Sequence, residues 1–317
     1  MSVTARIAVF AVGLVAIFAG AVGIGSLVDR ADTKTGAAHE EGGHAAERHS
    51  EGSPKEEEMY RDGGHRQMTP APAGLAVSEG GYSLLLAPTF LAQNAGRDLH
   101  FSITDADGET VSDFDELHER RMHLILVRRD GRGFQHLHPE MDEAGTWTEA
   151  LKLAESGVYR AFADFSVGGE QHTLASDLFV SGGSFQARPF PAPSALASTS
   201  GYDVSLEAEE LVAGKPSSLS FAVTRGGTEV DDLGPYLGAK GHLVALREGD
   251  LAFLHVHPEE ADGEHAHGGH PAATEEPAGN EIAFAATFPT AGHYRLYLQF
   301  KHKGAVRTVQ FTVSVSR

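Results

Sequence analysis

Apolar and polar residues alternate in short runs from about Leu75 onward, and glycine-containing turns separate the runs. Alternation with period two is typical of β-strands that bury one face. We expect strands at 82–87, 98–105, 122–129, 147–153, 158–165, 172–180, 202–208, 217–225, 241–248, 281–288, 293–300 and 307–315. Many short strands at this spacing predict an all-β sandwich architecture.

The second half of the chain repeats the first. MHLILVRRDGRGFQHLHPE (122–140) aligns without a gap with GHLVALREGDLAFLHVHPE (241–259), and SGVYRAFADF (156–165) aligns with AGHYRLYLQF (291–300). This duplication predicts two tandem immunoglobulin-like or cupredoxin-like β-sandwich domains, here called repeat 1 (75–183) and repeat 2 (202–317). A Pro-, Ala- and Ser-rich stretch at 184–201 is the expected linker between them.

The segment before the repeats differs in character. Residues 7–28 carry no charge, and as a helix they would span about 33 Å, enough to cross a bilayer. We therefore expect a membrane anchor at 1–30, with the body of the protein on the extracytoplasmic side. A cleaved signal peptide and a secreted product is the alternative. Residues 31–74, rich in Glu and His, predict a disordered tether.

Composition narrows the function classes. The formal net charge of −19 disfavours nucleic acid as a partner, because the chain would repel phosphates. The chain has no cysteine, so it has no disulfide, thiolate zinc site, iron–sulfur cluster or blue-copper ligand set. It has 18 histidines, and their placement directs attention to metal ions.

Three histidines recur at the same positions in both repeats, with the spacing His-x12-His-x-His. They are His123, His136 and His138 in repeat 1, and His242, His255 and His257 in repeat 2. Histidines that only stack or hydrogen-bond have no evident need for this triple conservation. We therefore predict one three-His metal site per repeat.

Turn chemistry predicts how the strands bearing these histidines pair. Asp130-Gly131 suits a two-residue type I′ hairpin turn, which places residues whose numbers sum to 261 opposite each other. Gly249-Asp250 suits a type II′ turn and a sum of 499. In repeat 1 this register sets the triad on one face above an apolar floor of Ile125, Val127 and Phe134. We expect Pro139 and Pro258 to end the return strands.

Donor chemistry favours copper or zinc as the cofactor, since sites made only of imidazole suit Zn, Cu and Ni. Weaker candidate ligands in repeat 1 are Asp164 and Met122, with Met141 as a further nearby thioether. In repeat 2 an insert at 259–280 carries His265, His267 and His270, which predicts a His-rich loop that adds ligands. His39, His44 and His49 on the tether form a second His-rich tract.

The stretch from Met122 to Phe165 resembles a bacterial group of exported β-sandwich proteins assigned to heavy-metal binding. The group shares a Met-His strand followed by Phe-x-His-x-His-Pro, and some members are associated with copper handling. The similarity covers about 80–182 and 202–316, and repeat 2 departs from it with Gly241 in place of the methionine. The resemblance implies membrane-associated metal binding and supplies no reaction.

Three functions remain open from the sequence. The first is a non-catalytic ectodomain that buffers, senses or hands over Cu or Zn, with a metal-transport protein as the expected partner. The second is a copper-dependent redox enzyme with two copper domains. The third is a structural immunoglobulin-like interaction module. No Ser/His/Asp arrangement, phosphate loop or catalytic carboxylate pair stands out.

Overall fold

The computed structural model describes residues 72–254, 256–258 and 281–317. The predicted anchor, nearly all of the tether, His255 and the His-rich insert lie outside the described residues. Throughout the described part the regular structure is β, which confirms the predicted all-β class. Within those same residues no helix is long and apolar enough to span a bilayer.

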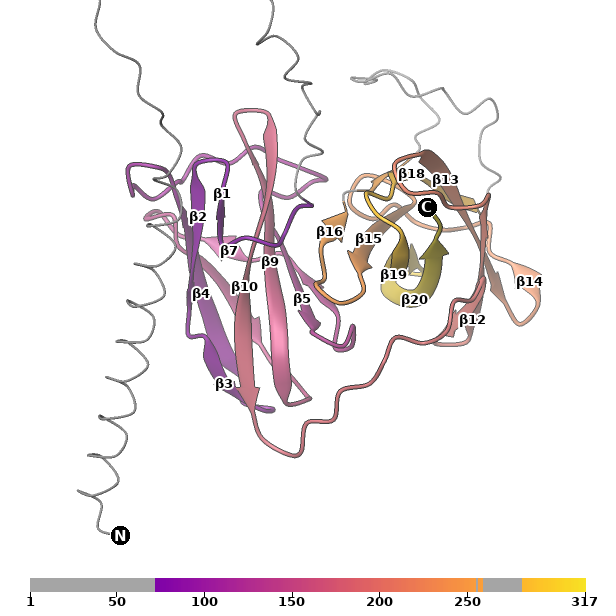
Figure 1. Cartoon of the computed structure of the whole chain (residues 1–317), viewed down its shortest axis with the longest axis horizontal. Helices are drawn as coiled ribbons and strands as arrows, with labels where there is room; N and C mark the ends of the chain where they lie inside the picture. The colour runs from indigo at the N-terminus through magenta and orange to yellow at the C-terminus, as the bar shows by residue number, and fades with distance from the viewer. Residues whose placement is uncertain (1–71, 255, 259–280) are drawn as a thin grey trace, which may run out of the picture. The chain divides into compact units, whose positions relative to one another are not determined.

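Two five-stranded sheets form repeat 1 (Figure 1). The first has the order β1-β2-β4-β8-β7, with β1 (Ser78–Glu79), β2 (Tyr82–Ala87), β4 (Arg97–Thr104), β8 (Trp147–Leu151) and β7 (Glu140–Met141). The second has the order β3-β10-β9-β5-β6, with β3 (Phe90–Ala92), β10 (Glu170–Ser181), β9 (Gly157–Val167), β5 (His123–Arg128) and β6 (Gln135–Leu137).

One apolar core joins these two sheets. Leu99 and Phe101 of β4 pack in the same buried cluster as Leu124 of β5 and Phe165 of β9. Because side chains alternate between the faces of a strand, every second residue of β5 enters this core, here called the inner core of repeat 1. Burial of the inner face holds the two sheets together as a sandwich.

Repeat 2 has the same arrangement with two sheets of its own. The first is β11-β12-β13-β18-β17, with β14 (Thr228–Glu229) beside β13; the strands are β11 (Leu196–Thr199), β12 (Tyr202–Ala208), β13 (Pro216–Arg225), β18 (Glu281–Thr287) and β17 (His257–Pro258). The second is β16-β15-β19-β20, with β16 (Phe253–Leu254), β15 (Gly241–Arg247), β19 (Gly292–His302) and β20 (Ala305–Val315).

Repeat 2 begins earlier than predicted. Strand β11 lies inside the stretch assigned to the linker and pairs with β12, with Thr199 opposite Tyr202. The two residues between them, Ser200 and Gly201, have φ values of 49° and 79°, as a type I′ turn requires. The Ser-Gly pair was the available signal for this hairpin, and the Pro- and Ala-rich composition around it concealed the strand.

The predicted register of repeat 1 is confirmed, whereas that of repeat 2 is confirmed only beside the turn, because His257 pairs with Ala285 of the other sheet and not with His242. Ile125 lies opposite His136, a sum of 261, and Ala245 lies opposite Leu254, a sum of 499. The predicted turn types are wrong. Gly131 and Gly133 have φ values of 73° and 63°, whereas Asp130 is not among the described residues with positive φ. Repeat 1 therefore uses a wider turn, and the second glycine restores the register.

The turn of repeat 2 is also wider than predicted. The amide of Leu251 donates to the carbonyl of Arg247 at 3.0 Å, and Leu251 itself has a φ of 60°. The return strand β16 ends at Leu254, and Pro258 lies within the next strand, β17, which joins the other sheet. Pro258 thus does not end the return strand. Pro139 lies just after β6, as predicted.

The outer faces of β5 and β15 are buried too. Residues of both repeats share one apolar cluster, which we call the inter-repeat core: Ile125, Val127, Phe162 and Ala175 from repeat 1, and Val244, Leu246, Leu251, Phe253 and Tyr297 from repeat 2. Phe134 packs against it, so the predicted apolar floor is confirmed. The floor belongs to both repeats because β15 carries the same apolar alternation as β5.

Candidate metal centre

Strand β5 sends alternate residues to two different environments. Leu124 and Leu126 enter the inner core of repeat 1, whereas Ile125 and Val127 enter the inter-repeat core. His123 has the parity of Ile125, and its side chain is buried at the edge of the inter-repeat core. The period of the strand therefore aims His123 at repeat 2.

His136 and His138 come from the return strand and the residues after it. The ring centroids of His123 and His136 are 5.1 Å apart, those of His123 and His138 are 5.2 Å apart, and those of His136 and His138 are 4.8 Å apart. The predicted triad of repeat 1 is thus present as a group of neighbouring imidazoles. The pairing of Ile125 with His136 sets this proximity.

His242 of repeat 2 lies in the same group. Its ring centroid is 4.7 Å from that of His136 and 5.7 Å from that of His123. Candidate ligand atoms of His123, His136 and His242 all lie within 4.8 Å of one another. The sequence predicted His242 for a separate triad with His255 and His257. The structure groups it with repeat 1 because the outer faces of β5 and β15 pack together. His255 and the side chain of His257 are outside the described part.

His118 is a member of the cluster that sequence reasoning missed. Its ring centroid lies 6.2 Å from that of His123 and 5.8 Å from that of His242. A tight turn, closed by backbone hydrogen bonds between Leu117 and Arg120, presents it. Repeat 2 has Leu237 at the corresponding position, so a search for histidines shared by both repeats does not select His118. A centre shared by both repeats needs no such symmetry.

Hydrogen bonds fix the tautomer of His123. Its Nε2 lies 2.8 Å from the carbonyl oxygen of Leu117. A carbonyl oxygen can only accept, so Nε2 of His123 carries the proton and Nδ1 of the neutral ring presents a lone pair. The turn that bears His118 therefore also orients His123.

Gln299 of repeat 2 has the same effect on His136. Nδ1 of His136 lies 2.6 Å from Oε1 of Gln299, while Nε2 of Gln299 donates to Oγ1 of Thr308 at 3.3 Å. With the amide in this orientation Nδ1 of His136 donates, and Nε2 presents a lone pair. That atom is 2.9 Å from Nδ1 of His123. Two lone pairs at this distance repel each other unless a cation binds both.

Burial holds the imidazoles in the neutral form that ligates metals. The pKa of His136 and that of His242 are well below the ordinary value, first because burial disfavours the charged ring and then because the neighbouring imidazoles repel a proton. Burial likewise lowers the pKa of His123, and it lowers that of His138 to about 4. A proton is therefore a weak competitor for these nitrogens near neutral pH.

Two further nitrogens of the cluster have no hydrogen-bond partner in the described structure. They are Nε2 of His138 and Nδ1 of His242, and both are buried. A buried polar atom without a partner costs free energy, so each such atom in a folded protein calls for an explanation. Coordination of an ion would satisfy both.

The two repeats place different side chains beside their histidines. Asp164 lies opposite His123 in the strand pairing, and Gln299 lies opposite His242. Asp164 accepts from Oγ1 of Thr173 at 2.9 Å, whereas Nε2 of Gln299 donates to Oγ1 of the corresponding Thr308 at 3.3 Å. Among the described residues, Asp164 is not in the set of close ligand atoms. Its negative charge acts on His123, whose pKa it raises against the larger effect of burial.

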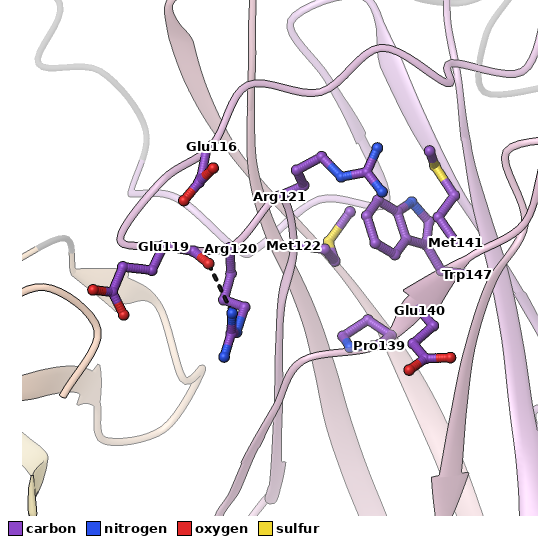
Figure 2. A pocket seen from close by; sticks show the side chains of 9 residues that line it. All are labelled: Glu116, Glu119, Arg120, Arg121, Met122, Pro139, Glu140, Met141 and Trp147. Carbon is purple, nitrogen blue, oxygen red and sulfur yellow. Dashed lines mark hydrogen bonds between the residues drawn. The ribbon is translucent and has the colours of Figure 1, made fainter.

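Met122 does not join the cluster. It has the parity of Leu124 and is buried in the inner core of repeat 1. Together with Met141 and Trp147 it lines a pocket bordered by Arg120 and other charged residues (Figure 2). The corresponding Gly241 of repeat 2 leaves no room for a methionine, because a Cβ there would lie 2.9 Å from the carbonyl oxygen of Gln299. Because its side chain lies in the inner core, on the face of β5 opposite to His123, Met122 does not meet the expectation that it is a ligand.

The donor set fits a transition-metal ion. Imidazole nitrogens bind Zn²⁺ at about 2.0–2.1 Å, so tetrahedral ligands lie about 3.3 Å from one another. The ligand atoms of His123, His136 and His242 already lie within 4.8 Å of one another, and the first two are 2.9 Å apart. Small side-chain rotations would bring all three onto one ion and leave a position for a fourth ligand.

The chain belongs to the family described as "Domain of unknown function (DUF8832)", which matches residues 76–182 and 197–317. The two matched segments correspond to the two repeats. No curated protein matches the sequence.

Three solved structures that match the chain are similar to it at low sequence identity. The Escherichia coli adhesin FdeC matches with a TM-score of 0.26 at 15% identity, over 76% of this chain and 66% of the adhesin chain. A Salmonella alpha-2-macroglobulin mutant has a TM-score of 0.26 at 14% identity, over 77% and 15%. The Yersinia pseudotuberculosis adhesin InvE has a TM-score of 0.22 at 12% identity, over 75% and 60%. The chain thus spans less than two thirds of each, and such scores do not establish a common fold.

Proposed function

We propose that this protein binds a divalent transition-metal ion, Cu(II) or Zn(II), in one centre built by both repeats. His123, His136 and His242 are the ligands, and His138 and His118 lie around them. The observation that carries the proposal is the pair of lone pairs on His123 and His136, 2.9 Å apart, with a ligand atom of His242 within 4.8 Å of both. Neutral, oriented imidazoles are the form that binds such ions.

Binding without catalysis is the simplest use of this centre. A two-copper enzyme needs separate copper domains, whereas here histidines of both repeats gather in one cluster. We propose buffering, sensing or handing over of the ion to a metal-transport protein. We also propose that each repeat is an immunoglobulin-like or cupredoxin-like domain, and that the apolar segment at 7–28 holds the protein on the extracytoplasmic side of the membrane.

The test uses a reference chain in which the histidines of the tether and the insert cannot contribute. It is the full chain with glutamine at positions 39, 44, 49, 65, 265, 267 and 270. Purified reference chain is loaded with Zn²⁺ or Cu²⁺, dialysed, and analysed for bound metal. The variants H136Q and H100Q are treated in parallel, since His100 lies outside the cluster and bonds only Thr148 among the contacts described.

We expect about one equivalent of metal in the reference chain and in H100Q, and a loss of at least about 100-fold in affinity in H136Q. For bound Cu²⁺, nitrogen hyperfine structure in the electron paramagnetic resonance spectrum identifies imidazole ligands. A reference chain that retains no metal would overturn the proposal, and so would an H136Q variant that binds as tightly as H100Q. A reference chain without metal is the result expected if the side-chain amide of Gln299 is flipped. Nδ1 of His136 would then accept from Gln299, and Nε2 of His136 would donate a hydrogen bond to Nδ1 of His123.

A further inference from the structure

The two repeats meet through apolar packing beside the cluster. Tyr297 of repeat 2 is fully buried, stacks on Phe134 with ring centroids 4.2 Å apart, and donates its hydroxyl to the carbonyl oxygen of Gly131 at 2.7 Å. The amide of Phe253 donates to the carbonyl oxygen of Ala73 at 2.9 Å. Ala73 precedes repeat 1, and its neighbour Gly74 is held on repeat 1 by hydrogen bonds to Thr173 and Arg160. None of these contacts involves a histidine of the cluster, so they hold the repeats together independently of it.

The cluster lies across the same boundary. Two side chains of repeat 2 enter it: His242 stacks near His123 and His136, and Gln299 accepts the hydrogen bond of His136. All other described members come from repeat 1. An ion that binds His242 together with the histidines of repeat 1 can do so only while the repeats are docked.

We propose that the bound metal ion fastens repeat 2 onto repeat 1, so that occupancy of the centre controls how often the two repeats separate. This inference rests on the proposed metal site and adds a regulatory role to it. The change in docking is the signal that a partner would detect, because separation exposes the inter-repeat core and docking hides it. Binding to the docked form alone multiplies the docking equilibrium by 1 + [M]/Kd, a factor of about 100 at 100 times Kd.

The experiment measures hydrogen exchange of the Phe253 amide in the reference chain. This amide is bonded to Ala73, so it exchanges when the repeats separate, when the segment at 73–74 lifts off repeat 1, or when repeat 2 unfolds. The amide of Gly74, bonded to the carbonyl oxygen of Thr173, reports lifting of that segment by itself. Its exchange rate is compared with and without Zn²⁺ at 100 times the measured Kd. Amides of β13 in repeat 2, such as that of Phe221, report unfolding of repeat 2 itself. We expect the Phe253 amide to slow by about 100-fold and to slow more than the β13 amides.

Two variants separate this inference from the proposed site. H242Q keeps three imidazoles in repeat 1, so at raised Zn²⁺ concentration it still binds the ion, but the Phe253 amide gains no protection. H293Q, which changes a repeat 2 histidine bonded to Glu248, behaves like the reference chain. Equal exchange of Phe253 with and without bound Zn²⁺ would overturn the clamp and leave the metal site standing. If H242Q does not fold, H242N serves as the second variant, and the same loss of Zn²⁺-dependent protection is expected.

Discussion

Gln299 of the second repeat accepts a hydrogen bond from Nδ1 of His136 in the first, with 2.6 Å between the nitrogen and the oxygen. This contact crosses the boundary between the repeats and fixes which nitrogen of His136 faces the cluster. Asp164, the residue of repeat 1 at the corresponding position, lies beside His123 instead. The duplicated sequence has thus diverged so that each repeat contributes different side chains to one histidine cluster.

Replacing Gln299 by leucine tests this contact. Q299L removes the acceptor, so His136 can turn or change tautomer, and we expect metal affinity to fall about 10–100-fold, as is typical when the partner of a ligating histidine is lost. Q186L changes an exposed glutamine far from the cluster in sequence and serves as the control. Competition titrations with a chromophoric chelator measure both affinities. Equal affinities in Q299L and Q186L would count against an orienting role.

The second prediction concerns the stability of the turn formed by His118 and Glu119. Both residues have left-handed backbone conformations, with φ values of 50° and 63°. Glycine relieves this strain, and after allowance for unfolded-chain entropy we expect E119G to gain about 0.5–1 kcal/mol in unfolding free energy. Its metal affinity should not change.

The substitution H118G also removes the strain of a left-handed backbone conformation, but it deletes an imidazole of the cluster. We expect its metal affinity to fall by about tenfold or more, because groups around the ligands tune the site. Chemical denaturation and metal titration of the two variants give the comparison. If H118G retains full affinity, His118 is only a neighbour of the centre.

The stability of the metal-free protein should depend on pH. In the unfolded chain the imidazoles return to a pKa of about 6.5, whereas in the folded protein burial lowers the pKa of His138 to about 4 and those of His136 and His242 well below the ordinary value. Above about pH 6.5 both states are neutral. Below it the unfolded state binds more protons, so stability falls as the pH falls toward 4.

Melting temperatures between pH 7.5 and 5 measure this effect in the presence of a chelator. A variant with glutamine at 136 and 138 should show a shallower decline than the reference chain over that range. Carboxyl groups with a lowered pKa, such as that of Asp130, also stabilise the folded protein, but this contribution is lost only at lower pH and does not affect the comparison. Identical slopes would mean that the cluster is not buried in its neutral form.

Met122 offers a negative test of the ligand assignment. Its side chain lies in the inner core of repeat 1, on the opposite face of β5 from His123. M122L keeps the volume of the core, so we expect a stability cost below about 1.5 kcal/mol and unchanged metal affinity. A large loss of Cu binding in M122L, with its folding intact, would return the thioether to the ligand set.

The fold was largely predictable from the sequence, and the reasons are local. The predicted run 82–87 coincides with β2, and 202–208 coincides with β12, because alternation reports directly which face of a strand is buried. The hairpin registers were right beside both turns although the turn types were wrong. A one-residue slip would have turned the apolar residues of β5 to the wrong face, so packing constrains the register more strongly than the turn does.

The grouping of the histidines was not predictable in the same way. It depends on the packing of two outer faces from distant parts of the chain, on which a period-two pattern gives no direct information. One signal was present: Leu124 to Val127 is a continuous apolar run, and such a run indicates a strand buried on both faces. A comparison of the two repeats selects only histidines that both repeats contain. It therefore favours two symmetric sites over one shared site, and it leaves out His118.

Metal stoichiometry in single and double variants tests the central claim most directly. The reference chain, H123Q, H242Q and the double variant are loaded with Zn²⁺ at a concentration that just saturates the reference chain, and bound metal is counted. A shared centre predicts about one equivalent in the reference chain and nearly none in either single variant, with no further loss in the double variant. Two equivalents in the reference chain, one in each single variant and none in the double variant would contradict it and indicate a separate site in each repeat.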